Sequence, residues 1–222
     1  MAGAAKAHYK EFLFFIILIF ALAIGGIFLF SKDASQTVSN DTPKSTDSAK
    51  MKQYDSPPPQ TIDTNKKYTA LLTTSKGLIT VEFFVKDTPE AVNNFVFLAR
   101  SGFYNGTIFH RVVKDFMIQG GDPKGDGTGG PGYTIADEKI TRDYKRGIIA
   151  MANRGSNTNG SQFFIMHKDY NLPKQYVIFG NVVSGIEIVD SIANVETVDN
   201  GQGEKSKPVE IVTLEKVEIA EE

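Results

Sequence analysis

The sequence contains no cysteine and no tryptophan, and its 222 residues carry a formal net charge of only −2. The absence of cysteine excludes disulfide bonds, thiolate metal sites, a cysteine nucleophile and a lipid-modified cysteine. The charge is nearly balanced and forms no basic stripe interleaved with aromatic residues, so nothing indicates a nucleic-acid partner. The length and a hydrophobic fraction of 41% instead suit one globular domain of ordinary size with appendages.

Common nucleotide-binding and hydrolytic motifs are also missing. The run Gly125–Gly130 formally satisfies G-x-G-x-x-G, but Pro131 follows where the helix of a dinucleotide site would have to begin. Ser161 lies in Asn-Gly-Ser-Gln rather than in G-x-S-x-G. His110 and His167 are the only histidines of the globular part, and they lack metal-ligand spacing. We therefore expect no metal, no cofactor and no nucleophile-base pair, and we expect His110 to be a packed strand residue.

The amino terminus contains a long apolar run. Residues 12–30 are uncharged and, at 1.5 Å per residue, can cross roughly 28 Å of hydrocarbon. Lys6 and Lys10 precede the run, which favours residues 1–11 in the cytoplasm and the rest of the chain outside it. We predict an uncleaved transmembrane signal anchor in a single-pass protein of the cell membrane. The alternative is a signal peptide with a cleavage site near Ala21-Leu22-Ala23, which would release a secreted protein.

Residues 31–66 differ sharply in composition from what precedes them. They are rich in Ser, Thr, Asp, Lys and Pro and contain few large apolar residues. Such a segment cannot bury enough apolar surface to offset the entropy lost on ordering it. We predict a flexible linker over 31–66, locally stiff at Pro57-Pro58-Pro59, and a globular domain over 67–222.

The globular part shows many short strand patterns, two short helix patterns and glycine turns. This mixture predicts a mainly β fold built as a closed or nearly closed barrel. Thr88-Pro89-Glu90 is a typical helix start, with a hydroxyl N-cap, a proline at the first position and an acid in the first turn. The acidic pair Asp137-Glu138 is expected in a solvated loop. The predicted strands include 68–74, 78–85, 147–152, 162–166, 176–183 and 209–219, and the predicted helices are 88–102 and 186–192.

The stretch FHRVVKDFMIQGGD, from Phe109 to Asp122, places one arginine inside an apolar strand. A buried cation is costly unless it is paired or lines an open groove. Phe116, Met117 and Gln119 follow Arg111 closely, which favours an apolar pocket with a few fixed polar groups. A core strand whose arginine reaches out to a surface carboxylate is the alternative.

Four motifs resemble a cyclophilin-type peptidyl-prolyl cis/trans isomerase: FHRVVKDFMIQGGD, GTGG at 127–130, MANRGSNTNGSQFFI at 151–165 and VIFGNV at 177–182. The resemblance runs from about residue 67 to 220. It implies a closed eight-stranded antiparallel barrel capped by two helices. Two positions depart from the family pattern: Asn171 stands where many relatives have a tryptophan, and Tyr176 stands where a histidine is frequent. The resemblance implies catalytic roles for Arg111, Phe116 and Gln119, and substrate-binding roles for Met117, Ala152, Asn153, Gln162, Phe164, Leu172 and Tyr176.

The reaction that the resemblance implies suits these residues. Rotation about an X-Pro bond requires no acid, base or nucleophile, but amide resonance imposes a barrier of roughly 18–20 kcal/mol. A guanidinium beside the prolyl nitrogen would stabilise the twisted transition state more than either planar ground state. We therefore predict a monomeric, membrane-anchored isomerase that acts on proline-containing peptides and unfolded proteins outside the cytoplasm. The alternative is a non-catalytic proline-peptide binding module or holdase chaperone tethered to the membrane.

Overall fold

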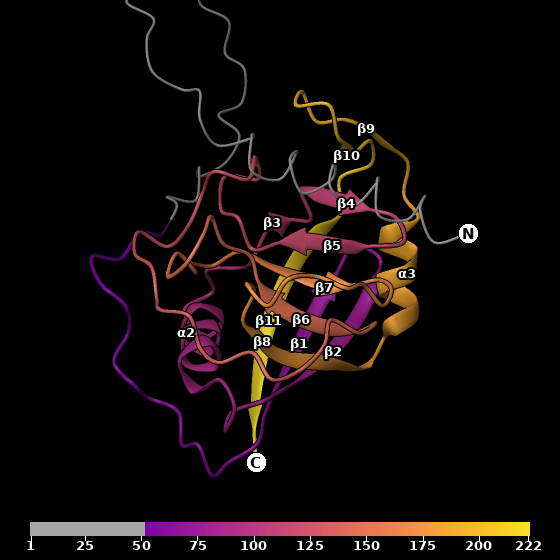
Figure 1. The fold of residues 1–222 in the computed structure, drawn as a ribbon. Helices are drawn as coiled ribbons and strands as arrows, with labels where there is room; N and C mark the ends of the chain where they lie inside the picture. The colour runs from indigo at the N-terminus through magenta and orange to yellow at the C-terminus, as the bar shows by residue number, and fades with distance from the viewer. Residues whose placement is uncertain (1–51) are drawn as a thin grey trace, which may run out of the picture. The chain divides into compact units, whose positions relative to one another are not determined.

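The computed structural model describes residues 52–222 (Figure 1). The predicted cytoplasmic segment 1–11, the predicted anchor 12–30 and residues 31–51 of the predicted linker lie outside these residues. Between residues 52 and 222, the helices are all too short or too polar to cross a bilayer.

One curved antiparallel sheet of nine strands dominates the described residues and forms a half-barrel (Figure 1). A separate hairpin pairs β9 (Thr197–Asp199) with β10 (Lys205–Pro208). Two helices, α2 (Pro89–Arg100) and α3 (Ile186–Ala193), complete the secondary structure of this part of the chain. The strands of the large sheet are, in spatial order, β3 (Thr107–Ile108), β11 (Thr213–Glu221), β1 (Tyr68–Thr74), β2 (Gly77–Phe83), β8 (Ile178–Ser184), β6 (Ile148–Met151), β7 (Phe163–Met166), β5 (Met117–Gly120) and β4 (Arg111–Val113).

The prediction of a closed eight-stranded barrel is wrong, because the sheet has nine strands and stays open between β3 and β4. These two edge strands are consecutive in the chain and are separated by Phe109 and His110. The chain changes partner at this point: β3 pairs with β11, whereas β4 pairs with β5. Beyond its pairing with β11, β3 makes one isolated bridge, in which Ile108 pairs with Asp122 just past the end of β5. Phe109 itself is 1% exposed and packs inside the core.

Helix α2 covers one part of the core and contributes its central ring. Phe95 is fully buried and stacks on Tyr104, with ring centroids 4.7 Å apart. The rings of Phe83 and Phe163 lie 5.3 and 5.5 Å from it. Burying one such ring contributes about 1.5–3 kcal/mol, and well-oriented aromatic pairs add about 0.5–1.5 kcal/mol. The helix is therefore held in place by the apolar face that its sequence pattern predicts.

The start of α2 is capped differently from the prediction. The Thr88 hydroxyl makes no cap and instead donates to the carbonyl of Ile178 at 3.3 Å. The carboxylate of Glu138 accepts from the N–H groups of Glu90 and Ala91, at 2.9 Å each. A carboxylate suits this place because a helix N-terminus carries unpaired N–H groups and a partial positive charge. Glu138 is therefore a half-buried helix cap, and the prediction of a solvated loop is wrong for it.

The prediction of a flexible linker is wrong for residues 52–66, which we call the strap. Ile62 is only 6% exposed and joins the main core cluster. The side chain of Asn93 on α2 accepts from the N–H groups of Thr61 at 2.8 Å and Ile62 at 3.3 Å, and donates to the carbonyl of Pro59 at 3.0 Å. Ile62, the amide of Asn93 and the ring of Tyr54, which packs on Phe97, thus help to hold a segment whose average composition is polar.

Candidate active site

The β4–β5 hairpin places Arg111 directly opposite Gln119. Neighbouring residues of a strand face opposite sides of a sheet, so the hairpin presents two different surfaces. Val112 and Ile118 are fully buried in the main core. Met117 lies in a second apolar cluster on the other face. The hairpin therefore anchors itself with one face and offers Arg111, Gln119 and Met117 on the other.

The guanidinium of Arg111 makes contacts on several sides. Its Nη1 donates to Oε1 of Gln119 at 3.2 Å and lies 3.8 Å from the sulfur of Met117. Its Nε and Nη2 donate to the two carboxylate oxygens of Glu204, each at 2.7 Å. Its Cζ lies 6.0 Å from the ring centroid of Phe116. The arginine therefore borders an apolar cluster and also reaches a carboxylate, so its contacts combine features of the two alternatives that the sequence left open.

A chain of amides extends from Arg111 to the glycine-rich loop. Gln119 donates through Nε2 to Oε1 of Gln162 at 3.0 Å. Gln162 in turn donates through Nε2 to the carbonyls of Gly127 at 3.1 Å and Gly129 at 2.9 Å. The backbone N–H of Ala152 donates to the carbonyl of Gln162 at 2.9 Å. The loop that formally resembles a phosphate-binding motif thus turns carbonyl oxygens toward this network, which is the wrong polarity for a phosphate.

An apolar surface lies beside this polar chain. Phe116, Phe164 and Leu172 are each at most 8% exposed, and Met117 is 1% exposed. The ring of Tyr176 meets the ring of Phe164 edge-on, with centroids 5.5 Å apart. A compact apolar wall with a few polar groups at its border is the usual form of a small-ligand site. The cluster consists of Phe116, Met117, Tyr144, Ile148, Ala150, Phe164, Met166, Leu172 and Ile178, with Ala152, Tyr176 and others packed against it.

Two side chains fix the segment that carries Tyr176. The hydroxyl of Tyr144 donates to the carbonyl of Tyr176 at 2.9 Å and accepts from its N–H at 3.1 Å. The amide of Asn153 donates to the carbonyl of Gln175 at 2.8 Å and to Oδ1 of Asn159 at 3.2 Å. Burial raises the pKa of Tyr144 and of Tyr176 above the ordinary tyrosine value, so both hydroxyls stay protonated at neutral pH. The wall of the apolar surface is therefore held in one position.

Comparison with known proteins assigns the chain to a family. Residues 69–219 match the family of cyclophilin type peptidyl-prolyl cis-trans isomerase/CLD proteins. The chain belongs to the cyclophilin-type isomerases. It is 45% identical over 136 residues to a peptidyl-prolyl cis-trans isomerase of Helicobacter pylori. That match covers 59% of this chain and 83% of the Helicobacter protein. The chain is 44% identical over 154 residues to peptidyl-prolyl cis-trans isomerase CYP18-1 of Arabidopsis thaliana. That match covers 67% of this chain and 93% of the Arabidopsis protein.

A solved structure supports the same conclusion. The crystal structure of a Cryptosporidium parvum cyclophilin type isomerase has a TM-score of 0.64 and 35% sequence identity, and covers 69% of this chain and 98% of its own. That protein has also been crystallised in the presence of the dipeptide Ala-Pro. The predicted enzyme class, peptidyl-prolyl cis-trans isomerase, is confirmed, and the non-catalytic alternative is disfavoured.

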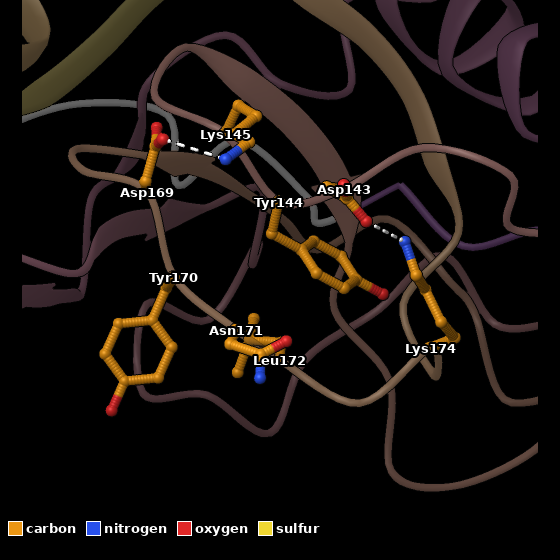
Figure 2. A pocket seen from close by; sticks show the side chains of 8 residues that line it. All are labelled: Asp143, Tyr144, Lys145, Asp169, Tyr170, Asn171, Leu172 and Lys174. Carbon is orange, nitrogen blue, oxygen red and sulfur yellow. Dashed lines mark hydrogen bonds and ion pairs between the residues drawn. The ribbon is translucent and has the colours of Figure 1, made fainter.

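The isomerase has a pocket that borders the apolar cluster at Tyr144 and Leu172 (Figure 2). This pocket has a volume of about 390 Å³ and is bordered by two ion pairs, Lys145–Asp169 at 3.1 Å and Lys174–Asp143 at 2.8 Å. Tyr170 lines this pocket, and its ring also contacts the ring of Phe116, with centroids 4.8 Å apart. The lining residues are Asp143, Tyr144, Lys145, Asp169, Tyr170, Asn171, Leu172 and Lys174.

His110 lies next to Arg111 and is packed inward. Both of its ring nitrogens are buried, and neither has a hydrogen-bond partner in residues 52–222. Burial lowers the pKa of His110 below its ordinary value of 6.5, although the charge of Asp122 acts in the opposite direction. The ring is therefore neutral at physiological pH.

The structure brings all ten predicted site residues into one continuous region. Arg111, Gln119 and Gln162 form the polar chain, Asn153 anchors one border, and the remaining six belong to the apolar cluster or pack against it. The sequence reasoning did not identify Glu204, which lies 93 positions from Arg111 in a polar stretch without periodicity. No local pattern links the two residues, so only the fold shows their contact.

Proposed function

We propose that Arg111 catalyses X-Pro rotation by stabilising the twisted transition state. In that state the prolyl nitrogen becomes pyramidal and regains a lone pair, which a charged N–H donor can meet. An interaction that exists mainly in the transition state raises kcat. Arginine suits this role because it stays protonated and carries several donors in a rigid plane.

The position of Arg111 at the border of the apolar cluster supports this role most directly. Its Nη1 lies 3.8 Å from the sulfur of Met117, and its Cζ lies 6.0 Å from the ring of Phe116. A proline ring held against Phe116, Met117 and Phe164 would therefore have the guanidinium beside its nitrogen. The amides of Gln119 and Gln162 and the backbone near Ala152 and Asn153 then line the path of the flanking peptide. We propose Leu172 and Tyr176 as further walls of the same pocket.

Substitution of Arg111 tests this mechanism against simple peptide binding. Removing one donor that stabilises a transition state typically lowers kcat by about 100- to 1,000-fold. Arg111→Ala should therefore reduce the isomerisation rate by this order while the affinity for an X-Pro peptide changes only a few-fold. Equal losses of rate and affinity would instead mean that the guanidinium binds substrate and transition state alike.

We further propose that the isomerase is anchored in the cell membrane and acts, as a monomer, on proteins that fold outside the cytoplasm. The uncharged run at 12–30 and the lysines before it support this location. Extraction at alkaline pH and the mass of the purified protein test it. An anchored protein stays in the membrane fraction at full mass, whereas a mature amino terminus near Ile24 would replace the anchor with a secreted protein.

A further inference from the structure

Glu204 and Arg111 form a two-point ion pair. Both carboxylate oxygens accept from the guanidinium, at 2.7 Å each. The two side chains are only 28% and 25% exposed, so the pair is largely shielded from water. Planar, bidentate pairs of this kind fix orientation as well as distance.

The pair uses a particular edge of the guanidinium. Glu204 occupies the edge formed by Nε and Nη2, and Gln119 accepts from Nη1. The plane of the guanidinium is therefore held from two sides. Of the five N–H groups, the second one on Nη2 has no protein acceptor within residues 52–222, and the second one on Nη1 faces only the weakly accepting sulfur of Met117. The donors left over lie on the end of the guanidinium and are available to a substrate.

The fold provides a rigid support for the carboxylate. Glu204 ends the turn between β9 and β10, and this hairpin lies beside β4, the strand that carries Arg111 (Figure 1). Within the turn, the N–H of Asn200 donates to the carbonyl of Glu204 at 2.9 Å, and the side chain of Asn200 accepts from the N–H of Glu204 at 3.3 Å. The N–H of Gly201 donates to Oδ1 of Asp199 at 2.7 Å. The turn thus sets the position of Glu204 without help from the substrate.

The electrostatics keep the pair charged. Burial alone would raise the pKa of Glu204, but the hydrogen bonds and the charge of Arg111 outweigh it, so its pKa lies below the ordinary value of 4.5. Glu204 is therefore ionised at neutral pH, where the isomerase is expected to work.

We propose that Glu204 is a positioning residue for isomerisation, which holds the guanidinium of Arg111 with its free end directed at the bound X-Pro bond. This inference rests on the proposed catalytic role of Arg111. It makes the β9–β10 hairpin, which lies outside the large sheet, part of the catalytic unit.

The test compares variants of the full chain by steady-state kinetics and by the NMR signal of the Arg111 Nε–H group. Glu204→Gln removes the charge of the carboxylate and weakens its two-point contact with the guanidinium of Arg111. The kcat should therefore fall by roughly 10- to 100-fold while KM stays within two-fold. The hydrogen bond to Glu204 should protect the Arg111 Nε–H signal from exchange in the parent protein, and this signal should be lost in the variant. Glu204→Asp retains the charge on a shorter side chain and should recover part of kcat. The matched control is Glu210→Gln, which removes an exposed ion pair with Lys76 and should leave kcat unchanged.

The outcomes separate this inference from the mechanism on which it rests. Full activity of Arg111→Ala would refute the catalytic role of the arginine. A large loss in Arg111→Ala, together with normal kcat in a folded Glu204→Gln protein that has lost the Nε–H signal, would overturn only the positioning role. A faster Glu204→Gln enzyme would also overturn it, because the carboxylate would then restrain the arginine rather than align it.

Discussion

Replacing Ile62 by alanine would measure how firmly the strap belongs to the fold. Ile62 is 6% exposed and is the buried apolar residue of residues 52–66. Truncating a buried isoleucine to alanine typically lowers the free energy of unfolding by about 2–5 kcal/mol. The strap lies at the border of the core and can relax around the substitution, so we expect the lower part of this range, about 2–3 kcal/mol. Because the strap does not supply any proposed catalytic residue, kcat should change little.

Urea unfolding followed by circular dichroism would measure this loss, and hydrogen exchange would locate it. The N–H of Ile62 donates to Asn93, so it should exchange slowly in the parent protein and much faster in Ile62→Ala. The matched control is Gln60→Ala, an exposed position of the same segment, where the change should stay within about 0.5 kcal/mol. If Ile62→Ala were as mild as the control and the strap amides exchanged freely, residues 52–66 would be the flexible tether that their composition predicts.

Three further predictions concern the cap, the buried histidine and the apolar wall. Glu138→Ala should lower the free energy of unfolding by about 1 kcal/mol, because two N–H groups of α2 lose their acceptor; an unchanged urea midpoint would contradict the cap. His110 takes up a proton less readily in the folded state than in the unfolded state, so stability should fall as the pH drops below 6.5, by at most about 1.4 kcal/mol per pH unit. His110→Gln should flatten this slope, leaving the part due to His167, whose pKa burial also lowers; identical slopes in urea titrations would refute the argument. Phe164→Ala should raise KM for an X-Pro peptide more than it lowers kcat, and the reverse pattern in steady-state kinetics would argue against a binding wall.

Local sequence patterns predicted most elements of the half-barrel. Alternating residues and a short turn marked the β1–β2 hairpin, and Thr88-Pro89 marked the first residue of α2 correctly. The closure of the sheet was predicted wrongly because it depends on which strands pair on either side of Phe109 and His110: β3 pairs with β11, and β4 pairs with β5. The pattern of apolar and polar residues along the chain does not reveal this change of pairing. The β9–β10 hairpin was missed because its strands are short, polar and largely exposed.

The candidate site could be predicted only where residues lie within recognisable motifs. All ten predicted residues lie together because each belongs to a motif of the family or stands at a matched position near one. The contacts of Glu204 and Glu138 could not be predicted from the sequence. Each carboxylate accepts hydrogen bonds from a residue about 50 or more positions away, which only folding brings close. The packing of the strap could not be predicted for a different reason: a composition averaged over residues 31–66 conceals individual anchoring residues such as Ile62 and Tyr54.

Two-dimensional exchange NMR on an X-Pro peptide, with catalytic amounts of the full chain, tests the central claim most directly. The account predicts exchange cross-peaks between the cis and trans forms with the parent protein, and their loss with Arg111→Ala while peptide binding shifts persist. Undiminished cross-peaks with a folded Arg111→Ala protein would contradict the account, because rotation would then proceed without the guanidinium.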